Sequence, residues 1–217
     1  MGMKVLSVDR DVEVDLTIPI EDLTREMIVH YLDGEPDVIV ASPVCSAWSK
    51  AGWFNHWDTK IYARAEIFVP KSPMATQSIE MVRKTIEIFS WFRSATYFME
   101  NPEGMLYKHP VIGNFVDYGL GNDLRREKVT YCKYGFDYMK PTHIWTNSKV
   151  WIPRPFCRNG DVCHTSVGRN DQGKGLKGKK DSFIRSVIPR ELCIEILSTI
   201  DPAAAKLMPP VYSAAVS

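Results

Sequence analysis

Residues 37 to 49, with the sequence DVIVASPVCSAWS, constrain the fold more than any other stretch of the chain. The stretch opens with the apolar run Val38 to Ala41, which Pro36 and Pro43 bound. A short uninterrupted apolar run between chain breakers is typical of a buried strand in a parallel sheet. A turn of small residues follows and presents Cys45. Open α/β sheets carry their chemistry beyond the carboxyl ends of their strands, so Cys45 is a candidate nucleophile. The alternative is that Cys45 is a small buried apolar residue.

A second strand of the same kind is predicted at residues 97 to 102, YFMENP, and it ends in Glu100. The segment before it carries a helix signal, because Ser72 suits an N-cap and Pro73 the first helical position. Apolar residues then recur at helical spacing from Ile79 to Phe89. The pattern strand, helix, strand predicts an α/β fold in which both strand ends meet at one edge.

Three motifs carry a resemblance to a known family. They are Ser-Pro-Val-Cys at 42–45, Glu-Asn-Pro at 100–102 and Tyr-Cys-Lys-Tyr-Gly at 131–135. In this order they resemble the DNA (cytosine-5) methyltransferases, and most closely the small phage- and virus-type members. The resemblance extends from about Val5 to Ile200. It implies a Rossmann-like sheet that binds S-adenosylmethionine, with an antiparallel hairpin at the sheet edge and DNA as the partner.

The resemblance also implies roles for single residues. Cys45 is expected to add to carbon 6 of cytosine, and Glu100 to protonate or hydrogen-bond ring nitrogen N3, with Asn101 beside it. The expected contacts of S-adenosylmethionine are Asp9 with the ribose, Asp15 and Leu16 with the adenine, and Pro43. From the residues themselves, Asp9 also suits a plain turn, because Asp9-Arg10-Asp11 is good turn chemistry.

The N-terminal part of the chain departs from the family. Residues 4 to 8 are predicted to form a strand that ends at Asp9, which corresponds to the second strand of the family's fold. Nothing in residues 1 to 5 resembles the first strand and its Gly-rich turn. We therefore expect a sheet that lacks its first, central strand, and weak binding of the cofactor. A gene start further upstream and a degenerate remnant are the two explanations.

The segment after Cys45 contains Trp48, Trp53, Phe54 and Trp57 without a clear period. It is predicted to be a loop. Such a loop beside a nucleophile suits a lid that closes on DNA. The alternative is that its aromatic side chains pack onto their own domain.

Residues 1–148 are predicted to form the catalytic domain and 149–182 an irregular target-recognition region. Residues 183–200 are expected to form a helix that returns to the catalytic domain, and 201–217 a frayed tail. The family's two-arginine motif stands here as Lys-Pro-Thr-His at 140–143. A basic run at 174–180 suits contacts with phosphates, although a solvated loop has the same composition. The residues expected to contact DNA are Lys140, His143, Lys174, Lys177, Lys179 and Lys180.

Cys157, Cys163 and His164 fall in the irregular region and are weak candidates for zinc ligands. Their spacing is not a standard pair of ligand pairs, and no fourth ligand is evident. The prediction from the sequence is therefore that the chain has no metal site.

Composition narrows the class of protein. The net charge is +1, so any binding to DNA must come from a local patch. Five scattered cysteines argue against a disulfide framework and for a reducing compartment. No signal peptide and no apolar run long enough to cross a membrane occurs. We expect a monomer in the cytoplasm, or in the host cytoplasm or nucleus if the protein is viral.

The predicted function is methyl transfer from S-adenosylmethionine to carbon 5 of cytosine in DNA. Three alternatives stay open. One is a catalytically degenerate relative that binds DNA, and another is an RNA cytosine-5 methyltransferase with the same Cys and Glu pair. The third is a thiol hydrolase, for which no histidine of this chain stands in a suitable motif.

Overall fold

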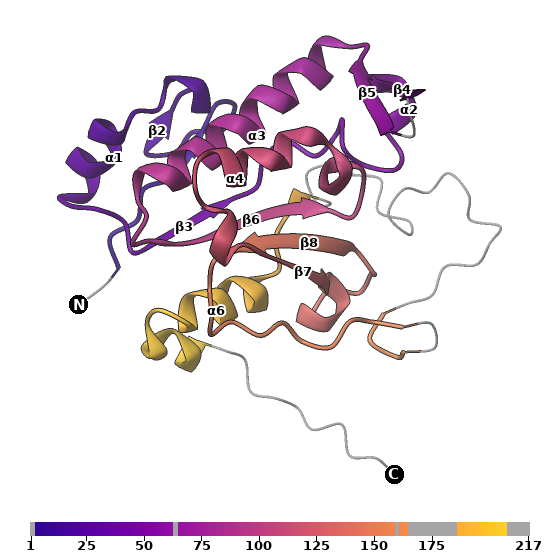
Figure 1. Cartoon of the computed structure of the whole chain (residues 1–217). Coiled ribbons are helices and arrows are strands. Elements are labelled where there is room, and N and C mark those ends of the chain that lie inside the picture. Colours follow the sequence, from indigo (N-terminus) through magenta and orange to yellow (C-terminus); the bar gives the residue numbers. More distant parts are fainter. Residues whose placement is uncertain (1–2, 63–64, 159–160, 165–185, 208–217) are drawn as a thin grey trace. The chain divides into compact units, whose positions relative to one another are not determined.

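Strand β6 (Thr96–Pro102) lies inside a four-stranded sheet of order β3-β6-β8-β7 in a computed structural model of the chain (Figure 1). Strand β3 (Val38–Ala41) runs parallel to it, with Val38 opposite Thr96 and Ala41 opposite Met99. Strands β8 (Pro141–Thr146) and β7 (Arg125–Thr130) are neighbours at the other edge, where the sequence predicts a hairpin. The prediction of an α/β protein is confirmed at this level.

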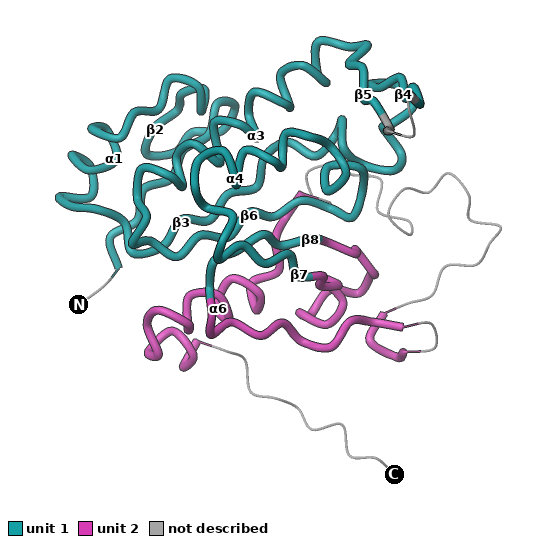
Figure 2. Tube along the Cα trace, viewed as in Figure 1, with its two compact units in different colours: residues 1–127, 143–148 teal, residues 128–142, 149–217 magenta. Residues whose placement is uncertain are grey.

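The structure describes residues 3–62, 65–158, 161–164 and 186–207. The chain divides into two units (Figure 2). The first contains residues 1–127 and 143–148, and the second contains 128–142 and 149–217. The predicted domains place 128–142 in the catalytic domain and return the C-terminal helix to it. In the structure, 128–142 and helix α6 (Arg190–Ser198) belong to the second unit.

The burial predicted for the strand before Cys45 is wrong in part. β6 has a neighbour on each side, and its residues from Tyr97 to Asn101 are buried. β3 pairs with β6 alone among the strands that the structure describes. Its side chains are therefore half-buried, and Val40 is 48% exposed. An apolar run indicates that the side chains of a strand are at least partly buried, but it does not show how many neighbouring strands the strand has.

Helix α3 (Pro73–Trp91) forms as its sequence predicts. The hydroxyl of Ser72 accepts a hydrogen bond from the backbone N–H of Ala75, and proline occupies the first turn. The face that carries Val82, Ile86 and Phe89 packs in the main core of the first unit. That core includes Tyr97 and Met99 of β6. Burial of each such apolar side chain stabilises the fold by ~1.5–3 kcal/mol.

The N-terminal segment differs from the predicted strand over residues 4 to 8. Strand β1 is only Val8–Asp9, and it pairs in parallel with β2 (Leu16–Thr17) as a separate two-stranded sheet. The 3-10 helix η1 (Ile20–Asp22) and helix α1 (Arg25–Leu32) follow. Leu16 packs in a second apolar cluster of the first unit.

The tryptophan-rich segment after Cys45 belongs to the core. Trp48, Trp53 and Trp57 are at most 7% exposed, and Trp48 stacks on Trp57 with ring centroids 4.8 Å apart. Helix α2 (Trp53–His56) leads into a hairpin of β4 (Trp57–Tyr62) and β5 (Ala65–Pro70), which the sequence analysis does not predict. The alternative to the lid, aromatic side chains packed onto their own domain, therefore describes this segment.

The remaining described elements are short. In the first unit they are η2 (Leu106–Lys108), η3 (Pro110–Gly113), α4 (Asn114–Asp117) and η4 (Gly121–Asp123). In the second unit they are η5 (Tyr131–Tyr134) and η7 (Pro202–Leu207). The start of the predicted tail is thus helical: Ala204 is buried, and the guanidinium of Arg190 donates to the carbonyl of Leu207 at 3.1 Å.

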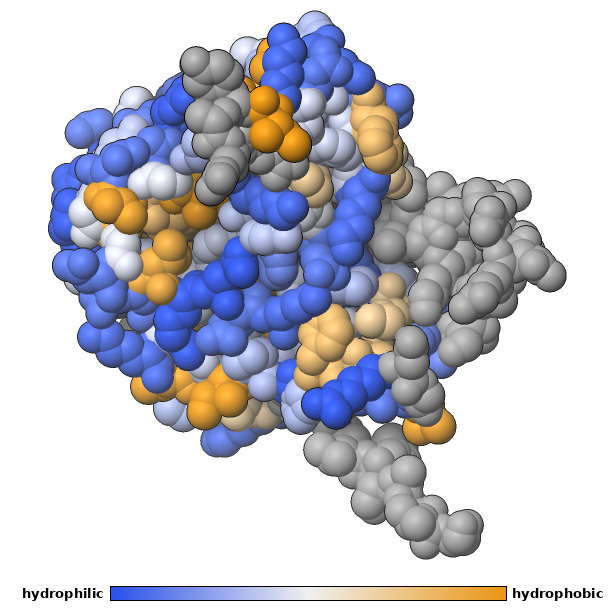
Figure 3. Space-filling model, turned by 45° about the vertical axis from the view of Figure 1, so that its right-hand side comes forward, coloured by the Kyte–Doolittle hydropathy of each residue, from blue (hydrophilic) through white to orange (hydrophobic). Residues whose placement is uncertain are grey.

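Apolar side chains on the face shown in Figure 3 form separate small groups among hydrophilic residues. The exposed large apolar residues are correspondingly scattered along the chain, from Phe54 and Ile61 to Val116 and Ile152. Scattered exposed apolar residues are normal for a protein surface. None of the helices in the described residues has the length and apolar character needed to cross a membrane.

His109 is a buried histidine of the first unit, with its ring 5.0 Å from that of Trp57. Its Nδ1 accepts a hydrogen bond from the backbone N–H of Val111 at 3.1 Å. Burial and, second, the charge of Arg83 lower the pKa of His109 from 6.5 to about 4. The unfolded chain therefore takes up this proton at a higher pH than the folded chain does.

We expect the stability contributed by neutral His109 to be complete above pH 6.5 and to be lost as the pH falls toward about 4. The loss should reach up to about 3 kcal/mol, since each pKa unit corresponds to ~1.4 kcal/mol. Urea unfolding at pH 7 and pH 4.5 measures it. If His109→Phe keeps the same loss between these two pH values, other groups carry it.

Candidate functional site

The loop after β3 and the end of β6 meet in the first unit. β3 and β6 are parallel and their last registered pair is Ala41 opposite Met99, so the residues that follow, Ser42 and Glu100, start from adjacent positions. The hydroxyl of Ser42 donates a hydrogen bond to Oε2 of Glu100 at 2.7 Å. Glu100 is only 4% exposed, so this bond orients a buried carboxyl group.

Asn101 makes the second connection between the two strand ends. Its side-chain nitrogen donates to the carbonyl of Pro43 at 2.9 Å, and the residue has no exposed surface. Its Oδ1 is buried and has no hydrogen-bond partner among the residues that the structure describes. A buried acceptor without a partner costs ~1–3 kcal/mol, a cost that a bound donor would remove.

Cys45 lies three residues beyond the serine that holds Glu100. It is half-buried and is not in a disulfide. Its carbonyl accepts hydrogen bonds from the backbone N–H groups of Trp48 at 3.0 Å and Ser49 at 2.9 Å, which closes a turn. The structure thus brings all three predicted catalytic residues, Cys45, Glu100 and Asn101, into two adjoining segments.

The turn that starts at Cys45 is held in place by a close contact with the backbone of Gly104 and Met105. The N–H of Met105 donates to the carbonyl of Trp48 at 2.8 Å, and Ser49 bridges to Gly104. A side chain at position 104 would place its Cβ 2.0 Å from the Trp48 carbonyl oxygen. Only glycine permits this approach, so Gly104 positions the turn.

Two of the residues predicted to bind the cofactor, Asp9 and Asp15, hold hydrogen bonds within the N-terminal part of the chain. Oδ1 of Asp9 accepts from the N–H groups of Asp11 and Val12, at 2.8 and 3.1 Å, as a turn aspartate does. Asp15 accepts from Ser7 through both its hydroxyl and its N–H, and from the hydroxyl of Tyr31. These bonds, the Ser7 hydroxyl first, lower the pKa of Asp15 to about 2.

Leu16 and Pro43 complete the predicted cofactor set. Leu16 is half-buried in β2, beside the turn that Asp9 closes. Pro43 is buried and tied to Asn101, in the loop that carries Cys45. Among the described residues, Pro43 is the one member of the set that hydrogen bonds attach to the candidate catalytic segments.

Two of the residues predicted to contact DNA, Lys140 and His143, are buried. Lys140 is 2% exposed, and its ammonium lies 4.4 Å from the centre of the Tyr131 ring. His143 is 6% exposed, with its ring 5.4 Å from that of Tyr107. Neither offers an exposed cation to a phosphate. The predictions for Lys174, Lys177, Lys179 and Lys180 fall outside the residues that the structure describes.

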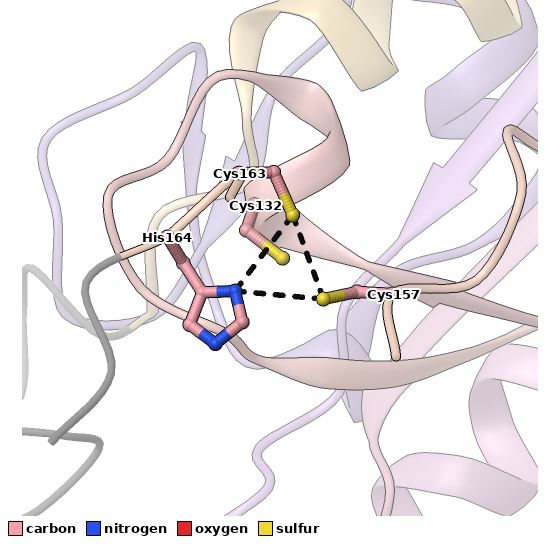
Figure 4. Close-up of side chains that lie close together, drawn as sticks. All are labelled: Cys132, Cys157, Cys163 and His164. Atoms are coloured by element: carbon pink, nitrogen blue, oxygen red, sulfur yellow. Dashed lines mark hydrogen bonds between the residues drawn. The ribbon is translucent and has the colours of Figure 1, made fainter. Parts of the chain in front are cut away.

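The weak metal candidates come together in the second unit. The side chains of Cys157, Cys163 and His164 are mutually within 3.7 Å, and Cys132 joins them (Figure 4). Burial and, next, the neighbouring Cys163 and Cys132 raise the pKa of Cys157 to about 12. Cys132 is not among the metal candidates predicted from the sequence, because it lies far upstream, within the Tyr-Cys-Lys-Tyr-Gly motif that carries the family resemblance.

Comparisons with known proteins give distant likenesses. No family model matches the chain, and no curated protein matches it. Among solved structures, a putative DNA modification methyltransferase encoded within an Escherichia coli prophage aligns with a TM-score of 0.43 and 12% identity, over 65% of this chain and 38% of that one. A mutant of DNMT2 from Spodoptera frugiperda aligns with a TM-score of 0.35 and 17% identity, over 67% and 39%. The chain thus spans less than two fifths of either protein.

Proposed function

We propose that this chain acts on the cytosine ring as a DNA cytosine-5 methyltransferase does, with Cys45 as the nucleophile. The observation that supports this most is the pair of hydrogen bonds from Ser42 to Glu100 and from Asn101 to Pro43. They hold a Pro-x-Cys loop and a Glu-Asn strand end together, which are the two segments that this chemistry requires. The choice of this family rests on the resemblance of the three sequence motifs.

The roles follow from the reactivity of cytosine. Carbon 5 of the ring is too weak a nucleophile to take a methyl group directly. When the thiolate sulfur of Cys45 bonds to carbon 6, the π electrons of the 5,6 double bond move toward carbon 5 and make it nucleophilic. A proton or hydrogen bond from Glu100 at N3 neutralises the charge that develops in the ring. Once carbon 5 has taken up an electrophile, loss of its original proton and departure of the thiolate restore the aromatic ring.

Asn101 and Ser42 are positioning residues in this scheme. Ser42 donates to one oxygen of Glu100 and so fixes the plane of the carboxyl group. Asn101 holds the Cys45 loop through Pro43, and its buried Oδ1 still lacks a partner among the described residues. The exocyclic amino group of cytosine is a donor that fits such an acceptor. A base can reach buried groups of this kind only after it leaves the duplex.

The methyl donor implied by the resemblance is S-adenosylmethionine. Asp15 already accepts three hydrogen bonds, two from Ser7 and one from Tyr31, so an adenine would share this carboxylate with them. Asp9 closes its own turn through Oδ1. We therefore assign no step to the donor. Exchange of the carbon-5 hydrogen needs none, because addition of Cys45 alone allows carbon 5 to take up a solvent proton.

The test measures the cysteine addition with and without the methyl donor. Duplex DNA carrying deuterium at carbon 5 of cytosine should lose it to solvent when incubated with the full chain, since addition and reversal scramble that position. Duplex DNA carrying 5-fluorocytosine should form a covalent adduct in the presence of S-adenosylmethionine, because fluorine cannot leave as a proton does. Cys45→Ser should abolish both signals, and Cys193→Ser, at a half-buried thiol of α6, should keep both.

The outcomes separate the alternatives. Exchange without adduct would support Cys45 and place the defect in cofactor binding. Adduct formation by Cys45→Ser would contradict the assignment of the nucleophile. Neither signal with DNA, but exchange with tRNA, would favour the RNA methyltransferase. Binding of DNA without exchange on either nucleic acid would favour a catalytically degenerate relative.

A further inference from the structure

Four side chains of types that ligate metals form a cluster within the second unit, and none of the residues assigned to cytosine chemistry belongs to it. Cys132 comes from η5, and Cys157, Cys163 and His164 come from the irregular segment after β8. One donor atom from each lies within 4.8 Å of all the others. Figure 4 shows the three sulfur atoms and the Nδ1 side of the imidazole ring converging on one point.

The spacing of three of these atoms, those of Cys157, Cys163 and His164, fits a tetrahedral zinc ion. With Zn–S bonds of ~2.3 Å and Zn–N bonds of ~2.0–2.1 Å, ligand atoms at tetrahedral angles lie about 3.5–3.8 Å apart. The sulfur atoms of Cys157 and Cys163 are 3.5 Å apart. Nδ1 of His164 lies 3.5 Å from the first sulfur and 3.7 Å from the second. A disulfide would need ~2.05 Å between sulfur atoms, and both cysteines are free.

Neighbouring groups hold the ligands in place independently of any ion. The backbone N–H of Cys157 donates to the hydroxyl of Thr130 at 3.0 Å. Lys133, the residue after Cys132, forms a 2.7 Å ion pair with Asp161, which precedes Cys163 by two residues. The carboxylate of Asp161 also accepts from the N–H of Arg158 at 3.1 Å. All three segments that carry ligands are therefore attached to one another by these contacts.

We propose that Cys132, Cys157, Cys163 and His164 bind one Zn²⁺ ion as a structural site of the second unit. Thiolate and imidazole ligands select zinc over magnesium or calcium, which prefer oxygen. Four protein ligands fill the tetrahedron and leave no open position for water, as in structural rather than catalytic sites. Binding releases the three thiol protons to solvent, and neutral His164 binds through Nδ1. The ion would add a further link among the three segments that carry its ligands.

The first experiment measures metal in the full chain purified without chelators. Elemental analysis should find one zinc per chain in the wild type. Cys132→Ser and Cys157→Ser should each reduce the zinc content at least tenfold at equal dialysis, because each removes one of four bonds. Cys193→Ser and Cys45→Ser remove cysteines outside the cluster and should keep one zinc per chain.

A second measurement covers the case in which the serine variants fail to fold. Cobalt exchanged into the wild type should give the intense visible absorption of a tetrahedral thiolate site. His164→Cys should retain the metal with a shifted spectrum, since it converts three sulfur ligands into four, whereas His164→Ala should lose it. Three results would overturn the proposal: folded wild type without zinc, full zinc in Cys132→Ser, or a Cys157–Cys163 disulfide in the untreated protein. Stoichiometric iron in place of zinc would overturn the choice of metal.

Discussion

Gly104→Ala is expected to lower the free energy of unfolding by about 3 kcal/mol, because overpacking and a lost hydrogen bond add together. The new Cβ would lie 2.0 Å from the carbonyl oxygen of Trp48 and 2.9 Å from its carbonyl carbon. Both atoms belong to the backbone and cannot rotate away. The Trp48 carbonyl also accepts the N–H of Met105, so a shift breaks that bond.

The same substitution should impair the candidate catalytic turn. Trp48 donates its N–H to the carbonyl of Cys45, and its fully buried ring stacks on Trp57. A displacement of the Trp48 backbone is therefore passed on to Cys45. We expect hydrogen exchange at carbon 5 of cytosine to slow at least tenfold in the folded variant. A tenfold loss of rate requires the displacement of Cys45 to raise the activation free energy by only ~1.4 kcal/mol.

Gly34→Ala is the matched control. A Cβ at position 34 meets nothing within 4 Å, and Gly34 follows α1 in the same unit. Its effect should be below ~1 kcal/mol, with a stabilising sign if loss of freedom in the unfolded chain dominates. Thermal and urea unfolding of the two variants compare the positions directly. Equal midpoints would show that Gly104 does not approach Trp48 as closely as described.

The parts of the fold that depend on local sequence could be predicted. Helix α3 starts where Ser72 and Pro73 place it, because capping acts within four residues. Strands β3 and β6 occupy their predicted ranges to within one residue, because short apolar runs between breakers have few other uses. The two motifs at the ends of these strands were predicted to lie together for the same reason, since parallel neighbours share an edge.

Features that depend on distant partners could not be predicted. The half-burial of β3 depends on how many strands flank it, which its own residues do not encode. Trp48 and Trp57 lack a period because they pack against each other and His109, not along one helix face. The hairpin of β4 and β5 follows directly on this aromatic cluster and carries no Asn-Gly or Asp-Gly turn signal in its sequence.

Asp9 and Asp15 show that a sequence motif can match while the hydrogen-bond partners of its residues stay unknown. Asp9 and Asp15 stand where the resemblance expects cofactor contacts. In the structure Asp15 joins Ser7 to Tyr31 of α1. A sequence shows that a carboxylate is present but not which donors reach it first. Cys132 is the reverse case, since its partners lie too far along the chain for spacing to identify them.

The second large effect is expected from Glu195→Ala in α6. Its Oε1 accepts from the ring N–H of Trp151 at 3.1 Å and from the hydroxyl of Tyr134 at 3.2 Å. Its Oε2 accepts from Nε of Arg154 at 3.0 Å. Trp151 and Tyr134 are each 1% exposed, so alanine leaves two buried donors without this acceptor.

The expected loss from Glu195→Ala is about 3 kcal/mol, toward the lower end for a broken buried network, because the Glu195 side chain is 20% exposed and Arg154 keeps its bond to Glu191. For a chain of this size that loss corresponds to a fall of roughly 6–12 °C in melting temperature. Glu195→Gln keeps an acceptor for Trp151 but loses the charge opposite Arg154. Glu195→Gln should therefore retain about half of the ~3 kcal/mol that the Glu195 contacts contribute, because a neutral hydrogen bond has about half the strength of a charged one.

Glu80→Ala is the control that separates burial from charge. Glu80 pairs with Arg83 on the exposed side of α3, with side chains 51% and 42% exposed. Exposed pairs contribute ~0–1 kcal/mol, because water screens both charges and already solvates them well. Thermal unfolding should therefore place Glu80→Ala beside the wild type and Glu195→Ala well below it. If both variants melt together, the contacts of Glu195 with Trp151 and Tyr134 do not stabilise the second unit as expected here.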